Sequence, residues 1–331
     1  MSAAVPFGLR VDDALAAQMQ QGLDDVEALL LETVHSEDSL LTEASEHLVV
    51  AGGKRFRPML VLLAAQFGDA SAVGVIPSAV VVELTHLATL YHDDVMDEAP
   101  LRRGQVSANS RWTNTIAILT GDYLFARASD LLADLGSDAV RIQARTFARL
   151  VRGQIQETVG PEADADPLKH YLQVMADKTG SLIATSGQFG AMMAGAPSHV
   201  VDTLTSACEK IGVAFQLSDD ILDIASESFQ SGKTPGTDLR EGIKTLPMLH
   251  VLASSEPGDA RLRELLAAPI TDDDLHAEAL SLLRAHPAMD RARADTRQWA
   301  EDARAELLTL PDVPARGALE GLCDYVVSRT G

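Results

Sequence analysis

The chain contains two copies of the pattern Asp-Asp-x-x-Asp, one beginning at Asp93 and the other at Asp219. On a helix, residues i and i+4 share a face, so Asp93 and Asp97 point one way, and so do Asp219 and Asp223. Two carboxylates on one face repel each other and need a cation. Carboxylate oxygens suit Mg²⁺, which shares its coordination shell with substrate phosphates. If the two helices face each other, the pattern predicts a cage for several Mg²⁺ ions and a diphosphate.

An acidic triplet in an acidic protein is more often a solvated helix face than a metal site. These two copies differ because each follows an apolar stretch, residues 80–84 for the first and 211–215 for the second. Carboxylates are rarely buried without a partner. Two identical patterns in the same setting therefore favour a functional role over a solvated face.

The composition excludes several classes of protein. The 331 residues include 27 Lys and Arg against 48 Asp and Glu, a formal net charge of −21, and only 4% are aromatic. Nucleic-acid binding needs a basic face or stacking surfaces, so it is not expected. No apolar run reaches the roughly 18 residues of a membrane span, and no early segment resembles a signal peptide. With only two cysteines, we expect a reduced, cytoplasmic protein without a stable membrane span.

Apolar residues recur at spacings of three and four along most of the chain, which predicts helices. Gly and Pro mark the breaks, and alternating β-branched runs are scarce. No linker or long repeat divides the chain. We therefore predict one all-α domain, residues 1–331, with its active-site helices packed as a bundle.

Basic clusters accompany the acidic motifs. Lys54 and Arg57 follow a glycine pair, and Arg102 and Arg103 lie five and six residues beyond Asp97. Lys178-Thr179 precedes the second motif and Lys233 follows it. Arg makes bidentate contacts with phosphate, and Lys supplies a point charge. Taken alone, each cluster is more typical of a solvated protein surface. In so acidic a chain, however, cations beside both acidic motifs indicate anion binding.

Together these stretches resemble the trans-isoprenyl diphosphate synthases, the polyprenyl synthetase family. The matching segments are Gly53–Pro58, Glu83–Gly104, Gly121–Leu124, Lys178–Gly180, Phe215–Asp223 and Gly232–Pro247. The residues around the first motif and the ending Asp324–Arg329 resemble long-chain members from actinobacteria. The resemblance implies the isoprenoid synthase fold, a large helical bundle around a central cavity, and a homodimer. Transient membrane contact for product release is a further expectation.

The activity implied is that of a prenyltransferase, an all-trans-polyprenyl diphosphate synthase. It would condense isopentenyl diphosphate head-to-tail (1′-4) onto an allylic diphosphate, with Mg²⁺, for menaquinone or other isoprenoid biosynthesis. Asp93 and Asp97 would hold two Mg²⁺ ions, and Asp219 a third. The implied catalytic residues are Asp93, Asp94, Asp97, Asp219, Asp220, Lys178, Thr179 and Gln216.

The resemblance also separates two diphosphate sites. The residues implied for isopentenyl diphosphate are Lys54, Arg57, His86 and Arg103. Those implied for the allylic diphosphate are Arg102, Lys178, Thr179, Gln216 and Lys233. Thr179 and Gln216 could also face the allylic cation with oxygen dipoles. Lys244 is one place away from the family's usual lysine, about 100° around a helix, so no phosphate role is assigned to it.

Product length is expected to depend on Ala88 and Thr89, about one helical turn before Asp93. In the family, bulky aromatic residues here stop elongation early, so these small residues resemble those of medium- or long-chain enzymes. The alternatives are a shorter-chain geranylgeranyl or farnesyl diphosphate synthase and a regulatory subunit of a heteromeric prenyl synthase. An H-D phosphohydrolase, suggested by His92-Asp93, would need further His ligands. A terpene cyclase would have no use for Lys54 and Arg57.

Overall fold

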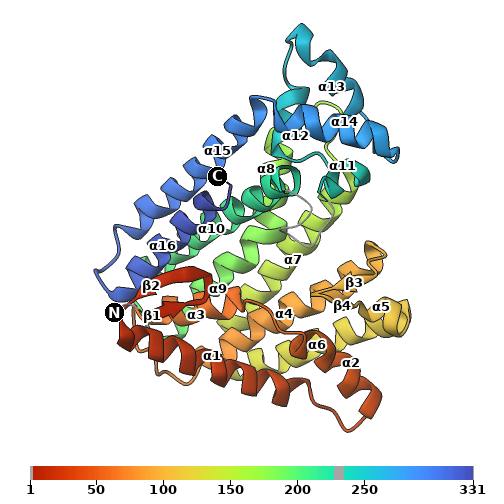
Figure 1. Cartoon of the computed structure of the whole chain (residues 1–331). Helices are drawn as coiled ribbons and strands as arrows, with labels where there is room; N and C mark the ends of the chain where they lie inside the picture. Colours follow the sequence, from red (N-terminus) through yellow and green to blue (C-terminus); the bar gives the residue numbers. More distant parts are fainter. Residues whose placement is uncertain (1–2, 227–234, 331) are drawn as a thin grey trace. The chain divides into compact units, whose positions relative to one another are not determined.

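The computed structural model describes residues 3–226 and 235–330, and these are helical almost throughout (Figure 1), which confirms the all-α prediction. None of the described helices is both long and apolar enough to cross a membrane. The α-helices are α1 (Asp13–Val34), α2 (Ser39–Val50), α3 (Phe56–Ala65), α4 (Val75–Met96), α5 (Ala108–Arg111), α6 (Asn114–Leu135), α7 (Ser137–Val159), α8 (Pro167–Met175), α9 (Ser181–Met193), α10 (Ser198–Ala225), α11 (Thr237–Glu241), α12 (Leu246–Leu252), α13 (Ala260–Leu265), α14 (Asp273–Arg284), α15 (Ala288–Leu307) and α16 (Pro314–Ser328).

Two short antiparallel hairpins accompany the helices. Strand β1 (Ala3–Val5) pairs with β2 (Leu9–Val11), and β3 (Leu101–Arg102) pairs with β4 (Gln105–Val106). Strands of two or three residues are too short to show the alternating apolar pattern that marks a strand in a sequence. The sequence analysis therefore did not predict them.

The internal contacts divide the chain into two compact units. The first comprises Met1–Ala148, Leu182–Cys208 and Glu306–Gly321, and the second comprises Arg149–Ser181, Glu209–Ala305 and Leu322–Gly331. The first acidic motif belongs to the first unit and the second motif to the second. The single domain stays a prediction.

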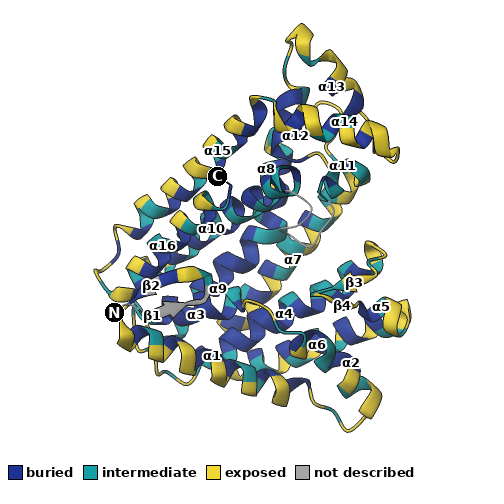
Figure 2. Ribbon diagram, viewed as in Figure 1, coloured by how far each residue is buried: buried dark blue, intermediate teal, exposed yellow. Residues whose placement is uncertain are grey.

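In the first unit, α4 packs against α1, α3 and α6. Most of α4 is buried, because its sequence is apolar on nearly all sides until the acidic motif. Helix α1 begins at Asp12, whose carboxylate accepts the N–H of Leu15 at 2.7 Å, a standard N-cap. Its predicted apolar stripe, including Met19 and Val26, is buried, and Figure 2 shows a buried and an exposed side along the helix.

In the second unit, the core is one apolar cluster built from α8 and α10 through α15. Leu217 and Ile221 of α10 belong to this cluster and are fully buried. They are interleaved with the second acidic motif, so the apolar face of α10 fixes the direction in which the carboxylates of Asp219 and Asp223 point.

Candidate active site

The first acidic motif lies at the carboxyl end of α4. The helix ends at Met96, and the N–H of Asp97 donates to the carbonyl oxygen of Asp93 at 2.8 Å. Asp93 is half-buried, and the side chain of Asp97 is 59% exposed. Two carboxylates one helical turn apart therefore stand where the sequence predicted them.

Asp94, between them, turns inward and is fully buried. Its Oδ1 accepts from Nε of Arg102 at 2.5 Å, and its Oδ2 has no hydrogen-bond partner among the described residues. Burial raises the pKa of Asp94, although the bond from Arg102 opposes the rise. The Arg102 guanidinium also lies 3.8 Å from Asp97. Arg102 is thus held against the motif, and its assignment to the allylic diphosphate stays a prediction.

A tight turn positions the two arginines. Arg103 (φ 51°) and Gly104 (φ 75°) connect β3 to β4, and two successive residues with positive φ are typical of a type I′ hairpin. Nη1 of Arg103 donates to the carbonyl oxygens of Leu48, at 3.0 Å, and Gly52. The hairpin therefore directs Arg102 toward α4 and Arg103 toward the glycine loop.

Arg55, to which the sequence analysis gave no role, anchors that glycine loop. It has a left-handed backbone (φ 46°) and is buried. Its guanidinium pairs with Glu27 and, at 2.8 Å, with the buried Glu83, and it also donates to the carbonyl oxygen of Val49 at 2.9 Å. Arg55 therefore fixes the loop between α2 and α3 to the core, in addition to the hydrogen bond from Arg103 to Gly52.

Arg57 and Arg103 form a cluster with the imidazole of His86 near Glu83. Burial lowers the pKa of Arg57 to about 10, with Glu83 opposing and Arg103 adding to the shift. Burial, and next the charges of Arg57 and Arg103, hold the pKa of His86 well below its ordinary value, so its imidazole is neutral. Nε of Arg57 is buried without a hydrogen-bond partner among the described residues. Such a cluster favours an incoming anion.

Lys54 stands apart from this cluster. It is exposed, and its Nζ lies 5.5 Å from the centre of the Phe7 ring. Lys54 and Phe7 line a hollow of about 390 Å³, together with residues of α1. The structure thus brings Arg57, His86 and Arg103 together and places Lys54 beside the N-terminal hairpin.

The two residues predicted to control chain length differ in their exposure. Ala88 is fully buried, and Thr89 is half-buried with its hydroxyl donating to the carbonyl oxygen of His86 at 2.8 Å. A Cβ added at Gly121 of α6 would lie 3.1 Å from the carbonyl oxygen of Ala88 and 2.4 Å from Nε2 of His92. His92 therefore packs closely on α6, as a helix-packing residue does.

The three carboxylates of the second motif have three different environments. Asp219 accepts from Nη2 of Arg329 at 2.5 Å. Asp220 is buried and accepts from the Tyr171 hydroxyl at 2.5 Å and from Gln216 at 3.0 Å. Burial raises the pKa of Asp220 to about 7, against the effect of those two hydrogen bonds. The side chain of Asp220 is therefore part of the buried interior of the second unit.

Asp223 caps the start of α11. Its two carboxylate oxygens accept from the backbone N–H groups of Thr237 and Asp238, each at 3.3 Å. These are amides of the first turn of α11, where a carboxylate satisfies donors that have no partner within the helix. Asp223 therefore connects α10 to α11, and the spacing of the motif alone did not reveal this.

Lys178 and Thr179 lie in a π-helical turn, Ala176–Gly180, which follows α8. Such turns occur mainly as single bulges at functional sites. The ammonium group of Lys178 pairs with Glu157, and the Thr179 hydroxyl donates to Oε1 of Gln216 at 3.3 Å. Since Gln216 also donates to Asp220, Thr179 and Gln216 come together next to the second motif.

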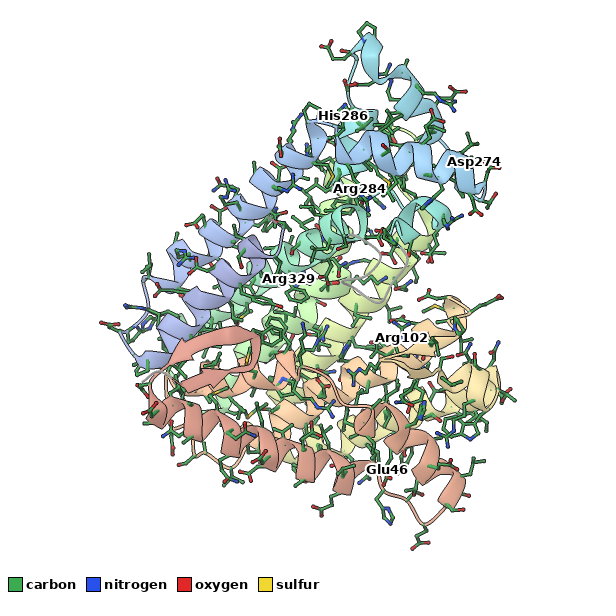
Figure 3. All side chains as sticks on the ribbon, in the orientation of Figure 1. Glu46, Arg102, Asp274, Arg284, His286 and Arg329 are labelled. Carbon is green, nitrogen blue, oxygen red and sulfur yellow. The ribbon has the colours of Figure 1, made fainter. Side chains whose placement is uncertain are left out.

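Sequence reasoning missed Glu157 and Arg329. Arg329 pairs with Asp219, and its guanidinium lies 4.5 Å from the centre of the Phe215 ring; Figure 3 labels it near the carboxyl end of the chain. The ending Asp324–Arg329 was noted in the sequence, but a partner 110 residues away cannot be read from local spacing. Of the other cations considered, Lys233 lies outside the described residues, and Lys244 is exposed.

The donor set at the first motif fits a hard cation. Asp93 and Asp97 offer carboxylate oxygens one turn apart, and the buried Oδ2 of Asp94 behind them adds negative charge. Mg²⁺ is usually bound by one or two carboxylates together with waters and substrate phosphates. Within residues 3–226 and 235–330, no three His, Cys, Asp or Glu side chains form a group that could hold a metal ion.

Residues 38–283 of the chain match the family model of the polyprenyl synthetases. The chain belongs to the polyprenyl synthetase family. A nonaprenyl diphosphate synthase of Mycobacterium tuberculosis is 52% identical, with 99% of each chain covered. A dimethylallyltranstransferase of the same organism is 42% identical, again over 99% of each chain.

Solved structures agree with this assignment. A geranylgeranyl pyrophosphate synthase from Corynebacterium glutamicum, crystallised with calcium and isoprenyl diphosphate, is 46% identical with a TM-score of 0.87, covering 97% of this chain and 98% of that one. The fold is therefore the isoprenoid synthase fold, as the motifs predicted. As a polyprenyl synthetase the protein is a prenyltransferase, in a family whose members generally depend on a metal ion.

Proposed function

We propose that this protein is an all-trans-polyprenyl diphosphate synthase that adds isopentenyl diphosphate units to an allylic diphosphate and makes a medium- to long-chain product. The observation that carries the proposal lies in the first unit. The acidic pair at the end of α4, with Arg102 beside it, could hold a metal-bound diphosphate, and the cluster of Arg57, His86 and Arg103 could bind a second diphosphate; the β3–β4 hairpin carries Arg102 to the first and Arg103 to the second. Two diphosphate substrates need two such sites.

The allylic diphosphate is assigned to the acidic motifs. Asp93 and Asp97 would hold two Mg²⁺ ions on it, Asp219 would hold a third, and Arg102 would bind its oxygens directly. The half-buried position of Asp93 and the exposure of Asp97 support this assignment, as does the ion pair that keeps Arg102 beside them. Lys178 and Lys233 are assigned to the same diphosphate.

Isopentenyl diphosphate is assigned to Arg57, His86, Arg103 and Lys54. The guanidinium group of an arginine can donate two parallel hydrogen bonds to the oxygens of one phosphate group. The neutral imidazole of His86 can donate one further hydrogen bond without adding a repelling charge. Buried cations with few partners gain the most from an anion, which supports Arg57 as the strongest member of the group.

In the reaction, the C–O bond of the allylic diphosphate breaks and the isopentenyl double bond attacks the resulting cation. Bound Mg²⁺ would supply positive charge as the diphosphate leaves. The side-chain oxygens of Thr179 and Gln216 would stabilise the allylic cation. Released diphosphate would accept the proton, so no histidine base is required.

Small residues before the first motif support the longer product. Ala88 is buried and Thr89 is half-buried, so neither places a bulky ring beside the helix face that leads to Asp93. The nonaprenyl diphosphate synthase relative agrees with a long product, and the dimethylallyltranstransferase relative keeps the shorter-chain alternative open.

We also propose that the protein is a cytoplasmic homodimer. Ile118 and Leu119 of α6 are large apolar side chains at the surface, 42% and 56% exposed, and a second copy of the chain could cover them. The chain has only two cysteines, Cys208 and Cys323, and such sparse use of cysteine suits the reducing cytoplasm. Light scattering after size-exclusion chromatography would show a dimer, and a monomer at micromolar concentration would contradict it.

The function is tested by incubating the purified protein with Mg²⁺, labelled isopentenyl diphosphate and, separately, dimethylallyl, geranyl, farnesyl and geranylgeranyl diphosphate. Chromatography of the products should show an all-trans chain longer than geranylgeranyl. A product that stops at farnesyl or geranylgeranyl would establish the shorter-chain alternative. No condensation by the protein alone would favour a regulatory subunit.

A further inference from the structure

The tip of the N-terminal hairpin carries an aromatic residue in an uncommon backbone conformation. Phe7 connects β1 to β2 with φ 68° and ψ 14°, in the left-handed region that bulky residues seldom adopt. The next residue, Gly8, has the same φ and, having no Cβ, can adopt it freely. The conformation of Phe7 must therefore be held by its contacts, and strained residues of this kind gather at functional sites.

Two contacts of Phe7 join the hairpin to the glycine loop. Its ring meets Phe56, the first residue of α3, edge to face with 5.0 Å between the ring centres. The Nζ atom of Lys54 lies 5.5 Å from the centre of the same ring. This is within the distance over which a cation is attracted to an aromatic face.

The loop around Lys54 is fixed on its other sides. Arg55 is anchored by Glu27 and Glu83, and a Cβ on Gly53 would lie 3.1 Å from the guanidinium carbon of Arg103. Lys54 itself is exposed beside the hollow of about 390 Å³. Within the described part of the chain, the Phe7 ring is the only partner recorded for its ammonium group.

We propose that Phe7 is a positioning residue that holds the ammonium group of Lys54 ready for the diphosphate of isopentenyl diphosphate. An ammonium group has three N–H donors, so a ring on one side leaves donors for phosphate on the other. Restricting a flexible lysine before binding also lowers the entropy cost of ordering it. The inference rests on the proposed function for the role of Lys54, and Phe7 acts through Lys54 alone.

The test compares Phe7→Leu, which removes the aromatic face but keeps an apolar side chain, with Phe7→Tyr, which retains it. The first measurement is the rate at which an amine-acylating reagent modifies Lys54 in the full chain, followed by peptide mass spectrometry. Phe7→Leu should speed modification about two- to fivefold, the effect of losing one exposed cation–π contact, and Phe7→Tyr should match the wild type. This readout requires no enzymatic activity.

The second measurement is steady-state kinetics. Phe7→Leu should raise KM for isopentenyl diphosphate about two- to fivefold, with kcat and KM for the allylic substrate unchanged. In a Lys54→Ala background the same substitution should have no further effect. A wild-type KM in Phe7→Tyr would show that the aromatic face, rather than the packing of the hairpin, sets the KM. Thermal unfolding of the two variants shows whether either has lost its fold.

Unchanged modification of Lys54 in Phe7→Leu would overturn the inference whatever the protein's function. Faster modification with an unchanged KM would also overturn it, because the contact would then exist without positioning the substrate. An effect that persists in Lys54→Ala, or that Phe7→Tyr does not reverse, would do the same. Failure of the wild type to condense isopentenyl diphosphate would instead refute the proposed function, since the modification experiment does not depend on it.

Discussion

Arg57 shows at the level of one residue why an anion should bind to this loop. Its Nε has no hydrogen-bond partner among the described residues, and burial lowers its pKa to about 10. Arg103 adds repulsion that lowers this pKa further, and the attraction of Glu83 opposes both effects without cancelling the effect of burial. A diphosphate placed there would accept a hydrogen bond from Nε of Arg57. Its negative charge would also offset the repulsion between Arg57 and Arg103.

Replacing Arg57 should therefore separate the two substrates. Arg57→Ala should raise KM for isopentenyl diphosphate about tenfold to over a hundredfold, because a charge-assisted hydrogen bond contributes ~1.5–3 kcal/mol. KM for the allylic primer should change little. The matched control is Arg141→Ala on α7, whose guanidinium pairs with Asp138 one turn away and is 61% exposed. Equal increases for both substrates would refute the assignment of Arg57.

His86 should make the folded protein sensitive to acid. Its pKa lies well below the ordinary 6.5, first because of burial and next because of Arg57 and Arg103. Below pH 6.5 the unfolded chain therefore binds a proton that the folded chain does not, and the free energy of unfolding falls as the pH falls. Above pH 6.5 the imidazole of His86 is neutral in both the folded and the unfolded chain, so His86 no longer lowers the free energy of unfolding.

His86→Gln should remove this dependence. Between pH 6.5 and 5.5 the slope of the unfolding free energy should decrease by up to ~1.4 kcal/mol per pH unit relative to wild type, measured by urea denaturation. His35→Gln is the control, since the His35 side chain is 69% exposed. Identical slopes for the wild type and His86→Gln would show that protonation of His86 does not oppose folding.

At the level of elements, the long helices could be predicted and the short features could not. The apolar residues of α1 recur with helical spacing, and the apolar run of α4 is longer than an ordinary strand, so both indicate helices and the ends at which motifs lie. The β3–β4 hairpin depends on one Arg-Gly pair, and the π-helical turn that carries Lys178 has no sequence pattern of its own. Yet these two short elements position three of the predicted cations.

Gly153 tests the placement of the π-helical turn. A Cβ there would lie 2.5 Å from the backbone nitrogen of Lys178, so Gly153→Ala must displace the turn. We expect a loss of ~1–3 kcal/mol in stability from overpacking, together with reduced turnover. Gly317→Ala in α16 is the control, because nothing lies within 4 Å of its added Cβ, and it should be neutral or stabilising. Wild-type behaviour of Gly153→Ala would contradict this close packing.

Ala88 tests the control of chain length by α4. Ala88→Phe should shorten the main product, because a rigid ring is added where close-packed walls cannot easily widen. The product distribution is read by reversed-phase chromatography after dephosphorylation. Ala133→Phe, on an exposed position of α6, should leave the distribution unchanged. An unaltered product from Ala88→Phe would show that this part of α4 does not limit elongation.

At the level of the whole molecule, contacts between residues close in the sequence could be predicted better than contacts between distant ones. Asp93, Asp97 and Arg102 are near one another in the sequence, so their proximity at the end of α4 could be expected. The pairing of Arg329 with Asp219 joins residues 110 apart, and only the folded chain reveals it. The burial of Asp94 likewise follows from how α4 packs.

The central claim is that the carboxylates at the end of α4 support metal-dependent condensation. Its most direct test is the rate of isopentenyl diphosphate incorporation by wild type and Asp93→Ala across a Mg²⁺ titration, with circular dichroism to verify folding. We predict a rate on the order of a thousandfold or more lower for Asp93→Ala at saturating Mg²⁺, and wild-type activity for the exposed control Asp134→Ala. Near-normal incorporation by a folded Asp93→Ala would contradict the account.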